Sequence, residues 1–210
     1  MARIGRHTFP LVMTESVSQF LAEVSAETGL DFSPPDAPDL ETSLFKLGNL
    51  ARIIGATLRD TANPTMLKAG YKANVIPQKA EAVIDCRVLP GGRQAAFEKE
   101  IDELLGPNVT REWITQLDSY ETTFDGDLVD AMNNAILAHD EQGKTVPYML
   151  SGGTDAKAFA KLGIRCFGFA PLQLPPDLDF AALFHGVDER VPVDAVLFGT
   201  KVFEHFLLHS

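Results

Sequence analysis

The fold class of this chain is decided by the stretch Val146-Pro147-Tyr148-Met149-Leu150-Ser151-Gly152-Gly153-Thr154-Asp155-Ala156. Its apolar residues predict a short strand over 146–150, and its glycines predict a turn after which Thr154 caps a helix to about Leu162. A second apolar run, 164–170, predicts a buried strand. Strand and helix alternate in this part of the chain, which is typical of an α/β domain.

Two sites of possible chemistry lie in and after this stretch. The Gly152-Gly153 turn either serves only a tight connection or presents backbone N–H groups to an anion at a helix N-terminus. About thirty residues later, His185-Gly186 precedes a helix that begins after Pro192 and runs from 193 to about 208. His185 is either structural or a metal ligand, and the acids in reach by spacing do not complete a site of three or four ligands: Asp155, Asp188 and Glu189.

The first half of the chain begins with a linker or strand remnant over 1–13, followed by two expected helices. Thr14 is a suitable N-cap for a helix that ends at Gly29. A proline loop (Pro34, Pro35 and Pro38) separates it from a second helix over about 40–59. That second helix carries one apolar stripe, formed by Leu44, Leu47, Leu50, Ile54 and Leu58.

The next segment changes to strand periodicity. The run 82–89 predicts a strand that stops at Pro90, and a helix over 93–105 follows it. Val109 to Leu117 then predicts another strand, so that a βαβ-type order is expected across 68–117. No internal repeat interrupts this pattern, and the change in character near residue 120 predicts a domain boundary there.

Composition limits the partners of the chain. Its 210 residues carry a net charge of −11, which argues against binding to nucleic acid or to an anionic membrane. No apolar run reaches the length of a membrane span and no signal-peptide core is present, so a cytoplasmic, soluble protein is expected. Cys86 and Cys166 lie in apolar runs and are expected as two buried thiols. The absence of a CxxC pattern excludes a thiolate zinc site.

Asn74 and Arg87 form a second pair of candidate residues. Asn74 lies between two strand-like segments, and Arg87 interrupts an apolar strand. Such an arginine either holds a carboxylate with two parallel hydrogen bonds or is an outward-facing charge at a sheet edge.

Four motifs in this order resemble those of one family, the zinc aminoacylase, desuccinylase and carboxypeptidase group of dinuclear metallo-hydrolases. They are Asn74-Val75-Ile76-Pro77, Ala82-Val83-Ile84-Asp85-Cys86-Arg87-Val88-Leu89-Pro90-Gly91, Ser151-Gly152-Gly153-Thr154-Asp155-Ala156 and His185-Gly186-Val187-Asp188-Glu189-Arg190-Val191-Pro192. The resemblance implies an α+β lid (dimerisation) domain over 1–118, N-terminally incomplete. The C-terminal portion of an α/β zinc-hydrolase catalytic domain is implied over 119–210.

The resemblance also assigns roles to particular residues. His185 matches the last metal ligand of the family, whose complete site holds two zinc ions, with cobalt or manganese as possible substitutes. Asn74 and Arg87 match lid residues that grip the substrate's carboxylate or scissile carbonyl. Gly152, Gly153 and Thr154 match the loop that lines the substrate-carboxylate pocket.

The sequence departs from the family in its metal ligands. The His-x-Asp motif, the bridging Asp and the Glu-Glu pair that supplies the general base have no counterpart here, so no catalytic residue is assigned. We therefore expect the C-terminal part of a longer hydrolase of N-acyl amino acids or small peptides, inactive as this isolated fragment. Its substrate would be a small molecule or dipeptide with a free carboxylate. A sheet that lacks strands exposes an edge, which predicts a homodimer. The alternative is a non-catalytic dimerisation or binding module.

Overall fold

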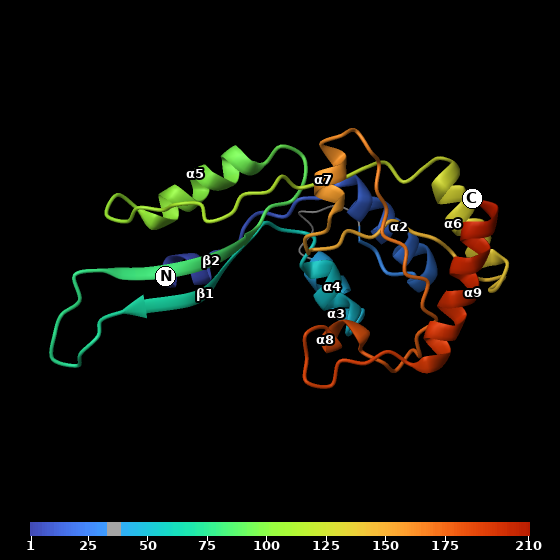
Figure 1. Ribbon diagram of the computed structural model, residues 1–210. Coiled ribbons are helices and arrows are strands. Elements are labelled where there is room, and N and C mark those ends of the chain that lie inside the picture. Colours follow the sequence, from blue (N-terminus) through green and yellow to red (C-terminus); the bar gives the residue numbers. More distant parts are fainter. Residues whose placement is uncertain (33–38) are drawn as a thin grey trace.

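A computed structural model describes residues 1–32 and 39–210 (Figure 1). The predicted proline loop at 34–38 lies outside the described residues. The elements follow one another along the chain as α1 (Ala2–Arg6), α2 (Glu15–Thr28), α3 (Asp39–Lys46), α4 (Leu50–Gly55), β1 (Thr61–Ala69), β2 (Ala80–Arg87), α5 (Gln94–Leu105), α6 (Asp127–Leu137), α7 (Ala156–Ala160), α8 (Phe180–Leu183) and α9 (Val193–His209).

Helix α2 forms where the sequence predicts it. The Thr14 hydroxyl accepts a hydrogen bond from the backbone N–H of Val17, and Gly29 ends the helix in the left-handed region at φ 69°. The predicted linker before it is partly helical, because Ala2–Arg6 forms α1. Leu11 makes an isolated antiparallel bridge to Arg59, which agrees with the alternative of a strand remnant.

The helix predicted over 40–59 is two helices instead of one. Gly48 takes φ 59°, a conformation that an α-helix cannot continue, and it separates α3 from α4. Most of the predicted apolar stripe still faces inward and packs on α2 in one cluster with Val17, Leu21 and Phe32. Leu50, at the break, is half exposed.

Strands β1 and β2 form an antiparallel two-stranded hairpin that projects from the body of the molecule (Figure 1). Thr61 pairs with Arg87 at its base, Ala69 pairs with Ala80 near its tip, and the register shifts between Pro64 and Met66. Proline has no N–H to give to a ladder, which accounts for the irregularity there. Helices α1 and α5 pack at the base through a cluster that includes Ile4, Phe9, Ala62, Phe97 and Ile101.

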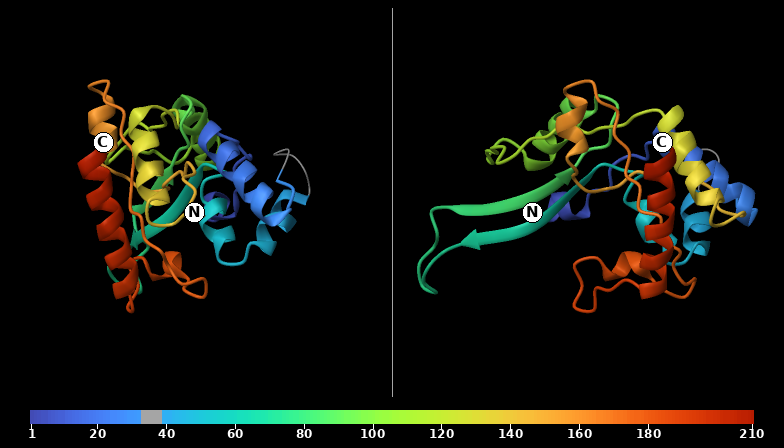
Figure 2. Two further views of the ribbon diagram at one scale, coloured as in Figure 1. Left: turned by 90° about the vertical axis from the view of Figure 1, so that its right-hand side faces the viewer. Right: turned by 45° about the vertical axis from the view of Figure 1, so that its right-hand side comes forward.

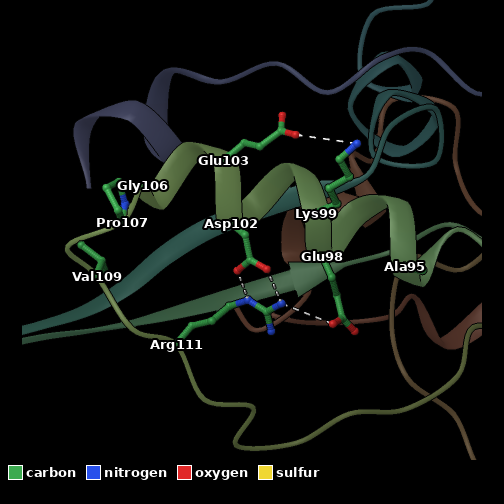
Figure 3. A pocket seen from close by; sticks show the side chains of 9 residues that line it. All are labelled: Ala95, Glu98, Lys99, Asp102, Glu103, Gly106, Pro107, Val109 and Arg111. Atoms are coloured by element: carbon green, nitrogen blue, oxygen red, sulfur yellow. Dashed lines mark hydrogen bonds and ion pairs between the residues drawn. The ribbon is translucent and has the colours of Figure 1, made fainter.

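The strand predicted over 109–117 is wrong, and with it the βαβ order. Figure 3 shows Arg111 turned back onto α5, where Asp102 and Glu98 hold it. The Arg111 guanidinium also lies 4.8 Å from the ring centroid of Trp113. These side-chain contacts fix the segment against the helix, and it joins neither strand of the hairpin.

The second half of the chain is held mainly by α6 and α9, which lie side by side in both views of Figure 2. Val129, Met132 and Ala135 of α6 are buried, as are Ala195 and Val202 of α9. The strands predicted at 146–150 and 164–170 are not formed, because no described segment supplies the backbone partner that a strand requires.

The α+β class predicted for the first domain is confirmed by its helices and small antiparallel sheet. The domain boundary at residues 118 and 119 stays a prediction.

Candidate functional site

A cleft of about 840 Å³ lies between the base of the hairpin and the second half of the chain. The end of β2 supplies Asp85, Cys86 and Arg87, and the loop before α7 supplies Ser151–Thr154. Aromatic side chains line the remaining walls, among them Trp113, Tyr120, Phe124, Tyr148, Phe167 and Phe169. Polar and charged side chains line the cleft as well, and a concave site with aromatic walls and convergent polar groups is a common form of small-molecule site.

Arg87 joins the two sides of this cleft. Its Nε donates to Asp85 Oδ2 at 2.7 Å, and its Nη1 donates to the carbonyl oxygen of Ser151 at 2.7 Å. The side chain is half exposed. The structure therefore brings together two candidates that lie 64 residues apart in the sequence, Arg87 and the Gly152–Thr154 loop.

The glycine loop differs from its prediction in one respect. The N-cap of α7 is Asp155, without a side-chain cap hydrogen bond, so the prediction that Thr154 caps this helix is wrong. Helix α7 has five residues, too few for an anion site at its N-terminus. Neither Gly152 nor Gly153 has a positive φ, and a Cβ at Gly153 would meet nothing within 4 Å. Backbone strain therefore does not require glycine here, and the loop leaves open space at the cleft.

Asn74 lies outside the cleft. It belongs to the loop between β1 and β2, at the exposed end of the hairpin. The structure does not bring it to Arg87, which lies at the hairpin base. Its role in gripping a substrate stays a prediction.

His185 is also outside the cleft. It follows α8, is exposed, and takes φ 58°, an unusual backbone conformation for a residue other than glycine. Nowhere in 1–32 and 39–210 are three or more His, Cys, Asp or Glu side chains grouped so that they could hold a metal ion. The donors present do not fit a complete metal centre, because such a centre needs three or four of them.

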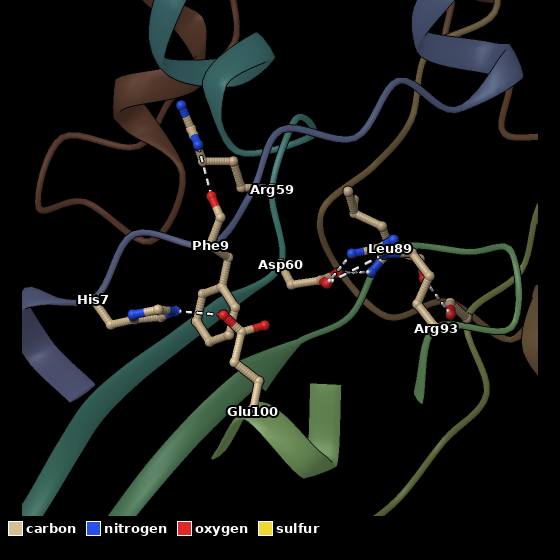
Figure 4. A network of polar contacts seen from close by, with 8 residues as sticks. His7, Phe9, Arg59, Asp60, Leu89, Arg93 and Glu100 are labelled. Atoms are coloured by element: carbon tan, nitrogen blue, oxygen red, sulfur yellow. Dashed lines mark hydrogen bonds and ion pairs between the residues drawn. The ribbon is translucent and has the colours of Figure 1, made fainter. Parts of the chain in front are cut away.

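The polar network at the hairpin base is a feature that sequence reasoning missed (Figure 4). The buried carboxylate of Asp60 accepts hydrogen bonds from the backbone N–H of Leu89 at 2.8 Å and from Arg93 Nε and Nη2 at 3.2 and 3.0 Å. The Ser119 hydroxyl donates to the Leu89 carbonyl. The network fixes the chain just after Arg87, and nothing in the local sequence marks Asp60 as buried.

A second missed feature joins the two halves of the chain beside the cleft. Glu121 accepts from the backbone N–H and the hydroxyl of Ser16, at the start of α2. The Tyr120 hydroxyl accepts from the backbone N–H of Cys166. Arg165 donates to Thr122 and to the carbonyl oxygens of Thr123 and Asp125. Segment 119–125 is thereby bonded to both halves.

A hollow of about 880 Å³ on α5 is a weaker candidate than the cleft (Figure 3). Its charged groups pair with one another: Arg111 donates to Asp102 at 2.6 and 3.0 Å and to Glu98 at 3.3 Å. The hydrogen bond from Arg111 lowers the pKa of Asp102, and bonds from Gln94 and then Arg111 lower the pKa of Glu98. Groups already satisfied in this way hold the 107–113 segment in place.

The two cysteines are free thiols, as predicted, although both are only partly buried. Burial raises the pKa of the Cys86 thiol. No described helix has the length and apolar character needed to cross a bilayer.

The first half of the chain is thus a helical unit with a protruding two-stranded hairpin, and the arginine at the hairpin base contacts the glycine loop of the second half. Residues 15–110 match the family model of the peptidase dimerisation domain, M20_dimer. Together with the relatives described next, this match places the chain in the M20 family of metallo-hydrolases, of which it covers the dimerisation portion.

Three relatives illustrate the likeness. The chain is 29% identical over 150 residues to the human N-fatty-acyl-amino acid synthase/hydrolase PM20D1 (68% of this chain, 29% of the relative), and 33% identical over 150 residues to the mouse protein of that name (67% and 29%). It is 27% identical over 161 residues to mouse aminoacylase-1 (70% and 36%). The matched part is therefore roughly a third of these relatives' length. No solved structure matches significantly.

Proposed function

We propose that this chain forms the lid and the carboxylate-binding wall of a metal-dependent hydrolase that cleaves amide bonds in N-acyl amino acids or small peptides. Membership of the M20 family supports the hydrolase class. The names of two relatives, an N-fatty-acyl-amino acid synthase/hydrolase and an aminoacylase, support N-acyl amino acids as the substrate class. A cytoplasmic location is part of this proposal.

The observation that carries the proposal is the contact between Arg87 and Ser151. A guanidinium has five N–H donors. Asp85 takes one of them and the Ser151 carbonyl takes another, so three remain on a side chain that is half exposed in the cleft. A substrate carboxylate can accept two parallel hydrogen bonds from such a group.

The aromatic walls of the cleft support the proposed binding of the apolar part of the substrate. Trp113, Tyr148 and Phe167 offer apolar surface to an acyl group or an amino-acid side chain. Gly153 lines the cleft beside Ser151, and a Cβ built there would meet nothing within 4 Å, so there is open space next to the loop. Gly152 and Thr154 complete this wall in the proposal.

A metal completes the proposed enzyme. Zinc is the ion that the family resemblance implies, with cobalt or manganese as alternatives, and it would activate water and polarise the amide carbonyl. His185 is the one ligand that we propose from this chain. Since the described donors do not form a centre around it, we expect no hydrolysis by the isolated chain.

Binding to the pure chain tests the proposal without requiring activity. We would titrate the chain with N-acetyl-L-alanine and follow backbone and arginine side-chain N–H signals by NMR, with the amide of the same compound as the ligand that lacks a carboxylate. Arg87→Gln should abolish the response to the acid. Arg190→Gln is the matched control, because Arg190 is an exposed arginine that also donates to a backbone carbonyl but does not line the cleft.

Equal binding of the acid by wild type and Arg87→Gln, or equal binding of the acid and the amide by wild type, would overturn the carboxylate assignment. Hydrolysis by the pure chain would overturn the expectation that the fragment is inactive.

One observation favours the alternative, a non-catalytic dimerisation module. Met66, Leu67 and Ile76 of the hairpin are 67%, 69% and 92% exposed, and no other described strand pairs with either edge of the two-stranded ribbon. Such a ribbon is marginal alone and forms a natural surface for a second copy. We propose a homodimer in either case.

Sedimentation at micromolar concentration tests the homodimer, and Leu67→Lys should shift the chain toward monomer. A monomeric wild-type chain would contradict both forms of the proposal. A dimer that does not bind N-acetyl-L-alanine would leave the dimerisation module as the better account.

A further inference from the structure

Three of the chain's five histidines, His139, His205 and His209, gather where the end of α6 meets the last turns of α9, and none of them lines the cleft. His205 and His209 lie one turn apart on α9, with ring centroids 4.3 Å apart and planes inclined by 28°. His139, just after α6, packs edge-on against His205 at 5.7 Å. Residues four apart on a helix share one face, so both α9 imidazoles lie on the same face, where His205 is partly exposed and His209 is exposed.

One hydrogen bond determines which ring nitrogen of His209 is free to bind a ligand. Nδ1 of His209 lies 2.8 Å from the carbonyl oxygen of His205. A carbonyl only accepts, so Nδ1 must carry the hydrogen, and the lone pair is therefore on Nε2. Metal-ligating histidines are commonly oriented in this way, with the second ring nitrogen donating to a backbone carbonyl.

We propose that His205 and His209 form a two-histidine chelate for a divalent transition-metal ion such as Zn²⁺ or Ni²⁺. Zinc–nitrogen bonds are about 2.0–2.1 Å long, so two nitrogens on one ion lie at most about 4 Å apart. The ring centroids are 4.3 Å apart, so the two rings are close enough for one nitrogen of each to reach a shared ion once the side chains turn from their stacked arrangement. Water fills the remaining coordination positions, since no third described donor is placed to do so.

Two further features favour a cation here. Imidazole suits Zn²⁺, Ni²⁺ and Cu²⁺, and the chain's net charge of −11 attracts cations to its surface. His139 lies beside the chelate as a packing neighbour that backs the ring of His205. This site shares no residue with the cleft or with His185, so it stands independently of the proposed function.

Calorimetric titration of the tag-free chain with ZnCl₂ and NiCl₂ tests the chelate. We expect one ion per chain, and His205→Ala or His209→Gln should weaken binding by about tenfold or more, because losing either ligand removes the chelate effect. His7→Gln is the matched control, because His7 is a histidine on another segment, where it pairs with Glu100, and this variant should bind as wild type does. Far-UV circular dichroism confirms that each variant keeps its helices.

Metal binding should also raise the Tm of the wild-type chain and leave that of His209→Gln unchanged, because an ion that binds only the folded state stabilises it. The proposal is overturned if His205→Ala and His209→Gln bind zinc as wild type does, or if His7→Gln loses binding to the same extent as they do.

Discussion

Removing the buried carboxylate of Asp60 should lower the free energy of unfolding by about 2–4 kcal/mol. In Asp60→Ala the N–H of Leu89 loses its acceptor, and an unsatisfied buried donor costs about 1–3 kcal/mol. The ion pair to Arg93 adds only about 1 kcal/mol, because the Arg93 side chain is 30% exposed and can turn to water.

Asp60→Asn separates these two contributions. Its side-chain oxygen can still accept from Leu89, so this variant should lose only the ion pair, about 1 kcal/mol. Arg93→Gln should cost more than Asp60→Asn, because it leaves a carboxylate that is 2% exposed without its cation. The double variant Asp60→Asn/Arg93→Gln should regain part of that loss.

Urea unfolding measures these changes through the fluorescence of Trp113, the chain's single tryptophan, which packs against the cluster at the hairpin base. All variants are compared at one protein concentration, because a dimer's stability depends on it. An Asp60→Ala variant within about 1 kcal/mol of wild type, at unchanged m value, would refute the reasoning. So would equal losses for Asp60→Ala and Asp60→Asn.

Three further predictions rest on single contacts. Gly199→Ala should lower the free energy of unfolding by about 1–3 kcal/mol in urea titrations, because the new Cβ would lie 2.5 Å from a backbone oxygen. Gly153→Ala is the control: its Cβ meets nothing within 4 Å, and it should change the free energy of unfolding by less than about 1 kcal/mol. Equal losses in the two variants would contradict this packing. The lowered pKa of Asp102 means that its stabilising contact with Arg111 is complete above the ordinary pKa near 4 and is lost as the pH falls through the folded-state value. Thermal unfolding from pH 6 to 2 should therefore show a steeper decline in wild type than in Arg111→Gln, and parallel curves would exclude the contact. Cys86, whose pKa is raised by burial, should react with iodoacetamide at pH 8 more slowly than glutathione does, as mass spectrometry of the alkylated peptide would show; a faster reaction would exclude the burial.

Local signals account for the parts of the fold that the sequence predicted. Helix α2 has a capping Thr14 and a terminal Gly29, and helix α9 begins directly after Pro192, so each boundary depends on residues within one turn. The break at Gly48 also has a local cause, but the apolar stripe continues across it and masks it. Periodicity alone therefore predicted one helix where the chain has two.

Strands depend on partners, which a local pattern does not show. Most of the run 82–89 belongs to β2, because β1 pairs with it as far as Arg87. The runs 146–150 and 164–170 are as apolar, yet no described segment pairs with them. In 109–117 the contacts of Arg111 with α5 decide the conformation, and they join residues that the strand pattern treats as unrelated.

The candidate site also depends on contacts between residues that are far apart in the sequence, which a local motif does not show. Family resemblance selected Arg87 and the Gly152–Thr154 loop separately, and only the folded chain places the guanidinium 2.7 Å from the Ser151 carbonyl. Asn74 and His185 were selected by the same resemblance, but they lie on an exposed hairpin loop and an exposed segment after α8, outside the cleft. The carboxylate-binding wall that we propose needs only one arginine and a backbone loop, and both are present in this chain. A metal centre needs three or four converging side chains, and the described residues supply no such group. In the function that we propose, binding of a substrate's carboxylate and cleavage of its amide are therefore separable: we expect the first from the chain itself, and the second only from an assembly that brings further ligands to His185.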